Sequence, residues 1–79
     1  MPHISVKMLK GRTEEQKRNL AEALAKTLTE QLRCSSQHVT ISIEDYTPVE
    51  WQEVFKREVT DKPAEKIYKK PEYDPKDLL

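Results

Sequence analysis

Pro2 is the residue of this 79-residue chain whose chemistry is most distinctive. If Met1 is removed, Pro2 becomes a free secondary amine, and a terminal amine has a reference pKa of about 7.7–8.0. Burial among apolar side chains, or a nearby cation, lowers such a pKa toward neutrality, where general acid–base catalysis is most effective. The alternative is structural, because proline is tolerated at the first residue of a strand.

Three further residues could form a site around such an amine. Arg12 could bind a carboxylate through two parallel hydrogen bonds, or it could be a solvated residue at the start of a helix. That end of a helix dipole disfavours a cation, which favours a role for Arg12 other than stability. Trp51 and Phe55 are four residues apart and share one face of a predicted helix. They could wall an apolar pocket or form ordinary core.

The composition predicts a single small domain over residues 1–79 whose own core is marginal. Hydrophobic residues make up 35% of the chain, and a chain this short buries only about 60% of its unfolded surface. We therefore expect oligomerisation to supply further buried surface. One cysteine excludes an internal disulfide, and without a cluster of Cys and His we expect no metal site.

The charge and hydropathy of the chain exclude two classes of partner. Lys and Arg number 14, as do Asp and Glu, whereas a nucleic-acid-binding surface needs a basic excess. No stretch is apolar enough to span a membrane, and no signal-peptide core follows Met1. A single cysteine also fits a reducing compartment. We expect a cytoplasmic protein with no nucleic-acid or membrane partner.

The first half of the chain predicts a strand, a long helix and a second strand. Side chains alternate in character over residues 2–9 and again over 38–45. Residues 14–33 carry a leucine at every fourth position, and Thr13 with Gln16 forms a capping box. We expect Arg33 to lie in the last turn of this helix. In this order the elements make a βαβ unit of the α/β (α+β) class, with parallel strands and a right-handed crossover. One helix covers one sheet face, so we expect oligomerisation to complete the sheet.

The second half of the chain predicts a short C-terminal helix over residues 48–58. Thr47 and Glu50 form a second capping box, with a proline at the first helical position. We also expect a helical turn near residues 63–69. We expect the tail from about residue 71 to be extended or mobile.

Taken together, these features resemble the 4-oxalocrotonate tautomerase family. The resemblance rests on Met-Pro-His-Ile at the start, on "GRTEEQK" opening the long helix and on "VTISIED" in the second strand. It covers residues 2–45 best. The later "TPVEW" and "KKPEY" resemble the dimeric PptA-like branch rather than the shorter hexameric members. The resemblance implies a cofactor-free keto–enol tautomerase, an isomerase that forms a homodimer.

The resemblance also implies a role for each candidate residue. Met1 would be cleaved, and the Pro2 nitrogen would act as the base that moves a proton in a 2-hydroxy-unsaturated or aryl-enolpyruvate acid. Arg12 matches the family arginine that holds a substrate carboxylate. Trp51 falls within one residue of the family aromatic that shapes the pocket, and Phe55 would help to keep that pocket dry. Thr40 stands where shorter members have a second arginine, which leaves the substrate open.

Two other functions stay open on the sequence. Relatives of this family hydrate or dehalogenate acrylates, or decarboxylate a semialdehyde, with a cationic Pro2. A high pKa of the Pro2 amine would favour those reactions, and a pKa near or below neutrality would favour tautomerisation. The third alternative is a non-catalytic oligomerising or protein-binding domain, and retention of Met1 in the cell would favour it.

Overall fold

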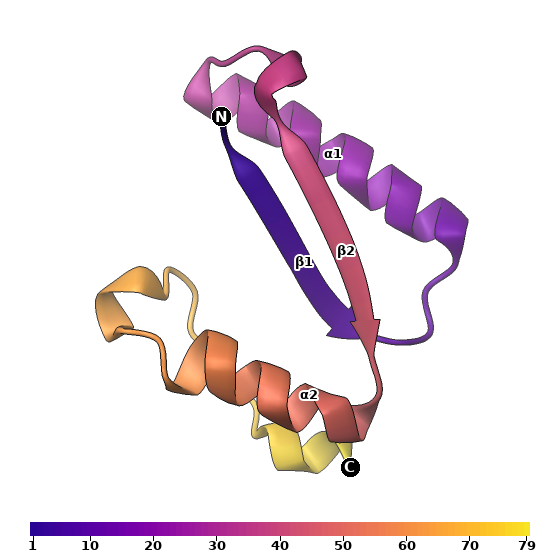
Figure 1. Ribbon diagram of the computed structural model, residues 1–79, viewed down its shortest axis with the longest axis vertical. Coiled ribbons are helices and arrows are strands. Elements are labelled where there is room, and N and C mark those ends of the chain that lie inside the picture. Colours follow the sequence, from indigo (N-terminus) through magenta and orange to yellow (C-terminus); the bar gives the residue numbers. More distant parts are fainter.

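A two-stranded parallel sheet forms the centre of the computed structural model, which describes all residues, 1–79. Strands β1 (His3–Leu9) and β2 (Thr40–Tyr46) are joined by helix α1 (Glu14–Leu32), and helix α2 (Pro48–Phe55) follows β2. Figure 1 shows α1 running along the strands and α2 crossing near their carboxyl-terminal ends. The predicted βαβ unit with a short C-terminal helix is confirmed.

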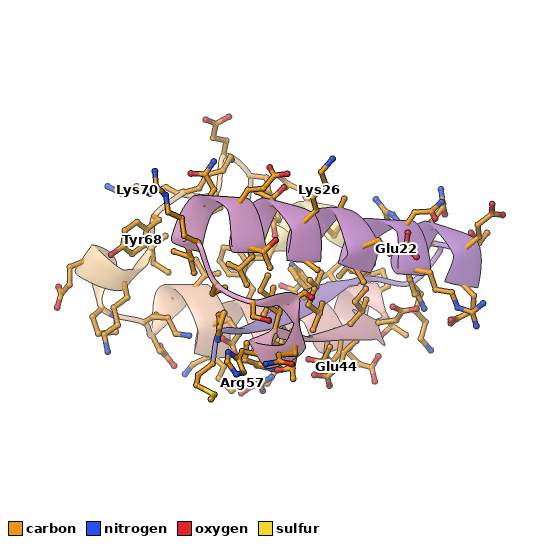
Figure 2. All side chains as sticks on the ribbon, turned by 90° about the horizontal axis from the view of Figure 1, so that it is seen from above. Glu22, Lys26, Glu44, Arg57, Tyr68 and Lys70 are labelled. Carbon is orange, nitrogen blue, oxygen red and sulfur yellow. The ribbon has the colours of Figure 1, made fainter.

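The two helices lie on opposite faces of the sheet. Lys17 of α1 donates a 2.5 Å hydrogen bond to Asp45 of β2, whereas Trp51 of α2 packs beside the neighbouring residue, Tyr46, with ring centroids 6.4 Å apart. Successive side chains of a strand point to opposite faces, so α1 and α2 cannot share one. Figure 2 shows α1, which carries Glu22, above the strands and Glu44 below them.

Local sequence signals set both ends of α1. The Thr13 hydroxyl accepts from the backbone N–H of Gln16 at 3.1 Å, and the Gln16 side chain accepts from the backbone N–H of Thr13 at 2.9 Å. The helix ends one residue before the predicted limit, because Arg33 caps it in the left-handed region (φ 53°, ψ 46°). The expectation that Arg33 lies in the last turn is therefore wrong. Glycine or asparagine usually holds this position.

The C-terminal part of the chain is less regular than predicted. After α2 the backbone forms a five-residue π turn over Lys56–Thr60, and a 3₁₀ turn at Ala64–Lys66 falls within the stretch where a helical turn was expected. A second 3₁₀ turn, Pro75–Leu78, brings the tail back against α2. The mobility expected from about residue 71, and the single domain over 1–79, stay predictions.

The chain buries little of its own apolar surface. Val54 of α2, at 4% exposure, is the only buried residue, and the leucines of α1 are all at least partly exposed. A chain this short builds only a marginal core by itself, and these surfaces are available to a second copy. None of the helices has the length and apolar character that crossing a membrane requires.

Candidate active site

One cavity of about 220 Å³ lies between β1 and α2. Its walls combine four apolar and three polar side chains: Trp51, Val54, Phe55, Val59, Ser5, Lys7 and Glu58. Pockets for drug-sized ligands measure about 300–1,000 Å³, so this cavity suits a smaller molecule. Trp51 and Phe55, which we predicted as pocket walls, both line it. Their role toward a substrate stays a prediction.

Lys7 is the cation of this cavity, and sequence reasoning did not select it. Its ammonium donates to Ser5 Oγ at 2.7 Å and lies 3.7 Å from a Glu44 carboxylate oxygen, and its side chain is only 20% exposed. Glu44 in turn accepts from the Tyr46 hydroxyl at 3.1 Å. Burial, and then this hydrogen bond to Glu44, raise the pKa of Tyr46. Tyr46 contacts Trp51 of the cavity wall but does not itself line the cavity.

Glu58 reaches the cavity from the π turn that follows α2. Its carboxylate accepts from the Lys62 ammonium at 3.0 Å, and this hydrogen bond lowers the pKa of Glu58. The cavity therefore has one fixed positive and one fixed negative side chain against its apolar walls. The π turn, which presents Glu58 and Val59, gave no recognisable signal in the sequence.

Helix α2 begins at a capping box that fixes the position of the aromatic walls. The Thr47 hydroxyl accepts from the Glu50 backbone N–H at 3.1 Å, and the Glu50 carboxylate accepts from the Thr47 backbone N–H at 2.8 Å. The second bond lowers the pKa of Glu50. On the outer side of the helix, the indole N–H of Trp51 donates to the Tyr73 hydroxyl at 3.0 Å.

Pro2 and Arg12 do not line the cavity of their own chain. They flank opposite ends of β1, a strand of seven residues, and about 3.3 Å per residue puts those ends about 20 Å apart. Gly11, at φ 131°, makes the turn that carries Arg12 out of β1, and such a φ favours glycine. One chain alone therefore does not bring together the four predicted site residues.

Thr40 lies beside the start of β1 and pairs with His3. The register aligns the two residues, and His3 Nδ1 lies 2.6 Å from Thr40 Oγ1. The Thr40 N–H also donates to the Pro2 carbonyl at 3.2 Å. Thr40 therefore lies next to Pro2 and is paired with His3.

Comparison with known proteins identifies the family. A family model described as "Tautomerase enzyme" matches residues 2–53. The 2-hydroxymuconate tautomerase of Bacillus subtilis (strain 168) is 44% identical over 45 residues, which are 57% of this chain and 73% of the relative. A probable tautomerase of Xylella fastidiosa (strain 9a5c) is 35% identical over 74 residues, 92% of this chain and 89% of the relative.

Solved structures agree with this assignment. The crystal structure of YwhB, a homologue of 4-oxalocrotonate tautomerase, gives a TM-score of 0.60 at 39% identity over 62% of this chain and 80% of that chain. The crystal structure of an apo, unfused 4-OT gives a TM-score of 0.61 at 36% identity, over 63% of this chain and 82% of that chain. The fold, the sequence match over most of the chain and these structures agree: the chain belongs to the tautomerase family, the isomerases that include 4-oxalocrotonate tautomerase.

Proposed function

We propose that this tautomerase interconverts the enol and keto forms of small 2-hydroxy-unsaturated or aryl-enolpyruvate acids, without a cofactor. The observation that supports this substrate class is the small cavity with Trp51 and Phe55 in its wall and one lysine on its polar side. Aromatic rings stack favourably with a flat conjugated acid. The B. subtilis relative, a 2-hydroxymuconate tautomerase, is named for a substrate of this kind.

The proposed reaction uses the free amine of Pro2 as both base and acid. The Pro2 nitrogen takes the proton of the enol hydroxyl, the oxygen becomes a carbonyl, and the former double bond places an electron pair on the neighbouring carbon. That carbon then takes a proton from the Pro2 ammonium, so the overall change is an isomerisation. The apolar walls lower the pKa of the amine and strengthen each charge interaction within the cavity.

Two copies of the chain are needed to build this site. Pro2 and Arg12 flank opposite ends of β1, so we propose that Pro2 of one copy approaches the cavity and Arg12 of another. Arg12 would hold the substrate carboxylate through paired hydrogen bonds. The half-exposed leucines of α1 leave the surface that such an assembly would cover.

Family membership indicates a small-molecule substrate and an oligomer. We propose a homodimer of the PptA-like branch rather than a hexamer, because α2 and the tail add a layer to the sheet. We also keep the cytoplasm as the proposed compartment, since the chain has a single cysteine and it is free.

The test is ketonisation of phenylenolpyruvate by protein from which Met1 has been removed. A matched sample that keeps a residue ahead of Pro2 has an amide at this nitrogen, and we expect it to be slower by at least about 100-fold, as for the loss of a general base. Circular dichroism and size-exclusion chromatography control for folding and assembly. Equal rates in the two samples would refute the role of Pro2.

Titration of Pro2 in the processed protein separates tautomerisation from the hydration of acrylates. A pKa near or below neutrality leaves the amine free to act as a base. A pKa well above neutrality would indicate a cationic Pro2 and would contradict the proposed reaction.

A further inference from the structure

We infer that Tyr73 is a positioning residue that fixes Trp51 and Phe55, and that the C-terminal segment 71–79 thereby sets the preference of the cavity for aromatic acids. The inference rests on the proposed function, because the proposed function places the substrate in this cavity. The contacts that support the inference are those that Tyr73 makes with Trp51 and Phe55 of α2. Tyr73 itself is not among the residues that line the cavity.

Tyr73 contacts both aromatic walls at once. Its hydroxyl accepts the hydrogen bond from the Trp51 indole at 3.0 Å, and its ring meets Phe55 edge to face, with centroids 5.6 Å apart and planes at 70°. The indole N–H is the only donor of a tryptophan side chain. This one bond therefore sets the direction of the Trp51 ring edge, while the ring contact restrains Phe55.

The segment that carries Tyr73 is itself held against α2. The Gln52 side-chain amide donates to the Pro75 carbonyl at 2.8 Å. The Asp74 carboxylate caps the following 3₁₀ turn by accepting from the Lys76 N–H at 2.9 Å. Tyr73 thus reaches Trp51 from a segment with its own anchors, rather than from a free end.

This arrangement extends beyond the part of the chain that the family model matches. That match ends at residue 53, so it includes Trp51 but neither Phe55 nor Tyr73. The Xylella relative, by contrast, aligns over 74 residues. The segment therefore lies outside the part that the family model matches, and this chain shares it with at least one relative of similar length.

Restraint of Trp51 affects binding more than chemistry. Without its hydrogen bond the indole populates other orientations. The apparent dissociation constant then rises in inverse proportion to the fraction of molecules that keep the orientation competent to bind. Once a substrate is bound the ring is fixed again, so kcat is unchanged. A flat aryl ring depends most on this orientation to stack, whereas 2-hydroxymuconate is a narrower conjugated chain that is held mainly through its two carboxylates.

The experiment compares Tyr73→Phe with Tyr68→Phe as the matched control, because Tyr68 belongs to the same half of the chain but is 97% exposed. KM and kcat are measured for phenylenolpyruvate and for 2-hydroxymuconate. For Tyr73→Phe we expect KM for phenylenolpyruvate to rise about two- to tenfold, the equivalent of one hydrogen bond. We expect kcat and the KM for 2-hydroxymuconate to stay at the parent values, as all four constants do in Tyr68→Phe.

Trp51 also gives a readout that does not need turnover, since it is the only tryptophan of the chain. Its emission should shift in Tyr73→Phe and stay unchanged in Tyr68→Phe. Gln52→Leu, which releases Pro75 without touching a cavity residue, should change KM and emission in the same directions. This second variant carries the test if Tyr73→Phe does not fold.

Any one of four results would overturn the inference. Parent-like KM and emission in both variants would show that Tyr73 does not position Trp51. An equal rise in KM for both substrates, or a fall in kcat alone, would show a general structural role. If the parent turns over neither acid, the proposed function fails. The inference is then tested by fluorescence titration with phenylpyruvate, and equal affinity in the parent and in Tyr73→Phe refutes the inference.

Discussion

The two halves of this chain are stabilised in different ways. In the β1–α1–β2 half every apolar side chain stays at least partly exposed, although its elements are regular and well capped. The half formed by α2 and the tail is irregular, yet it contains the one buried residue, Val54, and most of the cavity wall. The family match covers the regular half and continues into α2 as far as residue 53, and the irregular half provides most of the cavity wall.

The difference also concerns which contacts are local. The capping box of α1 joins residues three apart, whereas the bond from Trp51 to Tyr73 joins residues 22 apart. Local capping bonds and the backbone pairing of β1 with β2, whose partners lie 37 residues apart, form a scaffold that many sequences can share. Side-chain contacts between distant residues depend on the particular side chains at both ends, and they are where a family member acquires its own pocket.

The largest effect on stability should come from Val54, if the irregular half does hold the tightest packing. Val54→Ala removes two buried methyl groups and should lower the free energy of unfolding by about 2 kcal/mol. Val49→Ala, one and a half turns away on α2 and 73% exposed, should change it by less than about 0.5 kcal/mol. Urea unfolding at a fixed protein concentration measures both, and equal effects would show that Val54 does not provide the tight packing assigned to it.

The two capping boxes should matter about equally, because their geometry is the same in both halves. Thr13 and Thr47 each accept a 3.1 Å hydrogen bond from the residue three positions on. Thr13→Ala and Thr47→Ala should each lower the free energy of unfolding by about 1 kcal/mol. A large effect at Thr47 alone would mean that the regular half does not depend on its local signals.

The smallest expected effect is a difference between the two capping boxes in how much stability each loses at acidic pH. Glu50 has a folded-state pKa below its ordinary value because it accepts from the Thr47 N–H. Its contribution to stability is therefore complete above the unfolded-state pKa and is lost as the pH falls through the lower folded-state value. Gln16, the neutral counterpart in α1, has no such dependence.

Glu50→Gln should make the second box resemble the first. The thermal midpoint of the variant should fall less steeply than that of the parent between about pH 6 and pH 3. Gln16→Glu gives the reciprocal control and should add acid sensitivity. Identical pH profiles for parent and Glu50→Gln would show that the Glu50 carboxylate does not contribute.

Most of the scaffold could be predicted from the sequence because its signals are periodic and local. Alternation gave both strands, and leucine spacing with the Thr13 box gave α1 within one residue. Arg33 was misplaced because a left-handed cap on a non-glycine residue has no local signature. The π turn at Lys56–Thr60 was missed for a similar reason, since its hydrogen-bond pattern depends on how α2 packs.

The candidate site could be predicted only in part. Trp51 and Phe55 were found because their helical spacing is visible in the sequence. Lys7 was missed because an alternating lysine in a strand is read as solvent-facing, and only the packing of α2 shows that it borders a cavity. The separation of Pro2 from Arg12 follows from the extent of β1, which is why the proposed site takes them from two copies.

Complementation between two inactive proteins tests most directly whether Pro2 and Arg12 come from different copies. Protein with a residue retained ahead of Pro2 is unfolded and refolded together with the processed Arg12→Ala variant, and ketonisation of phenylenolpyruvate is measured. In a random mixture of two-fold symmetric dimers, half are mixed and each has one intact site, so activity should return to about a quarter of the parent. Activity no higher than the average of the two proteins alone would contradict a site shared between copies.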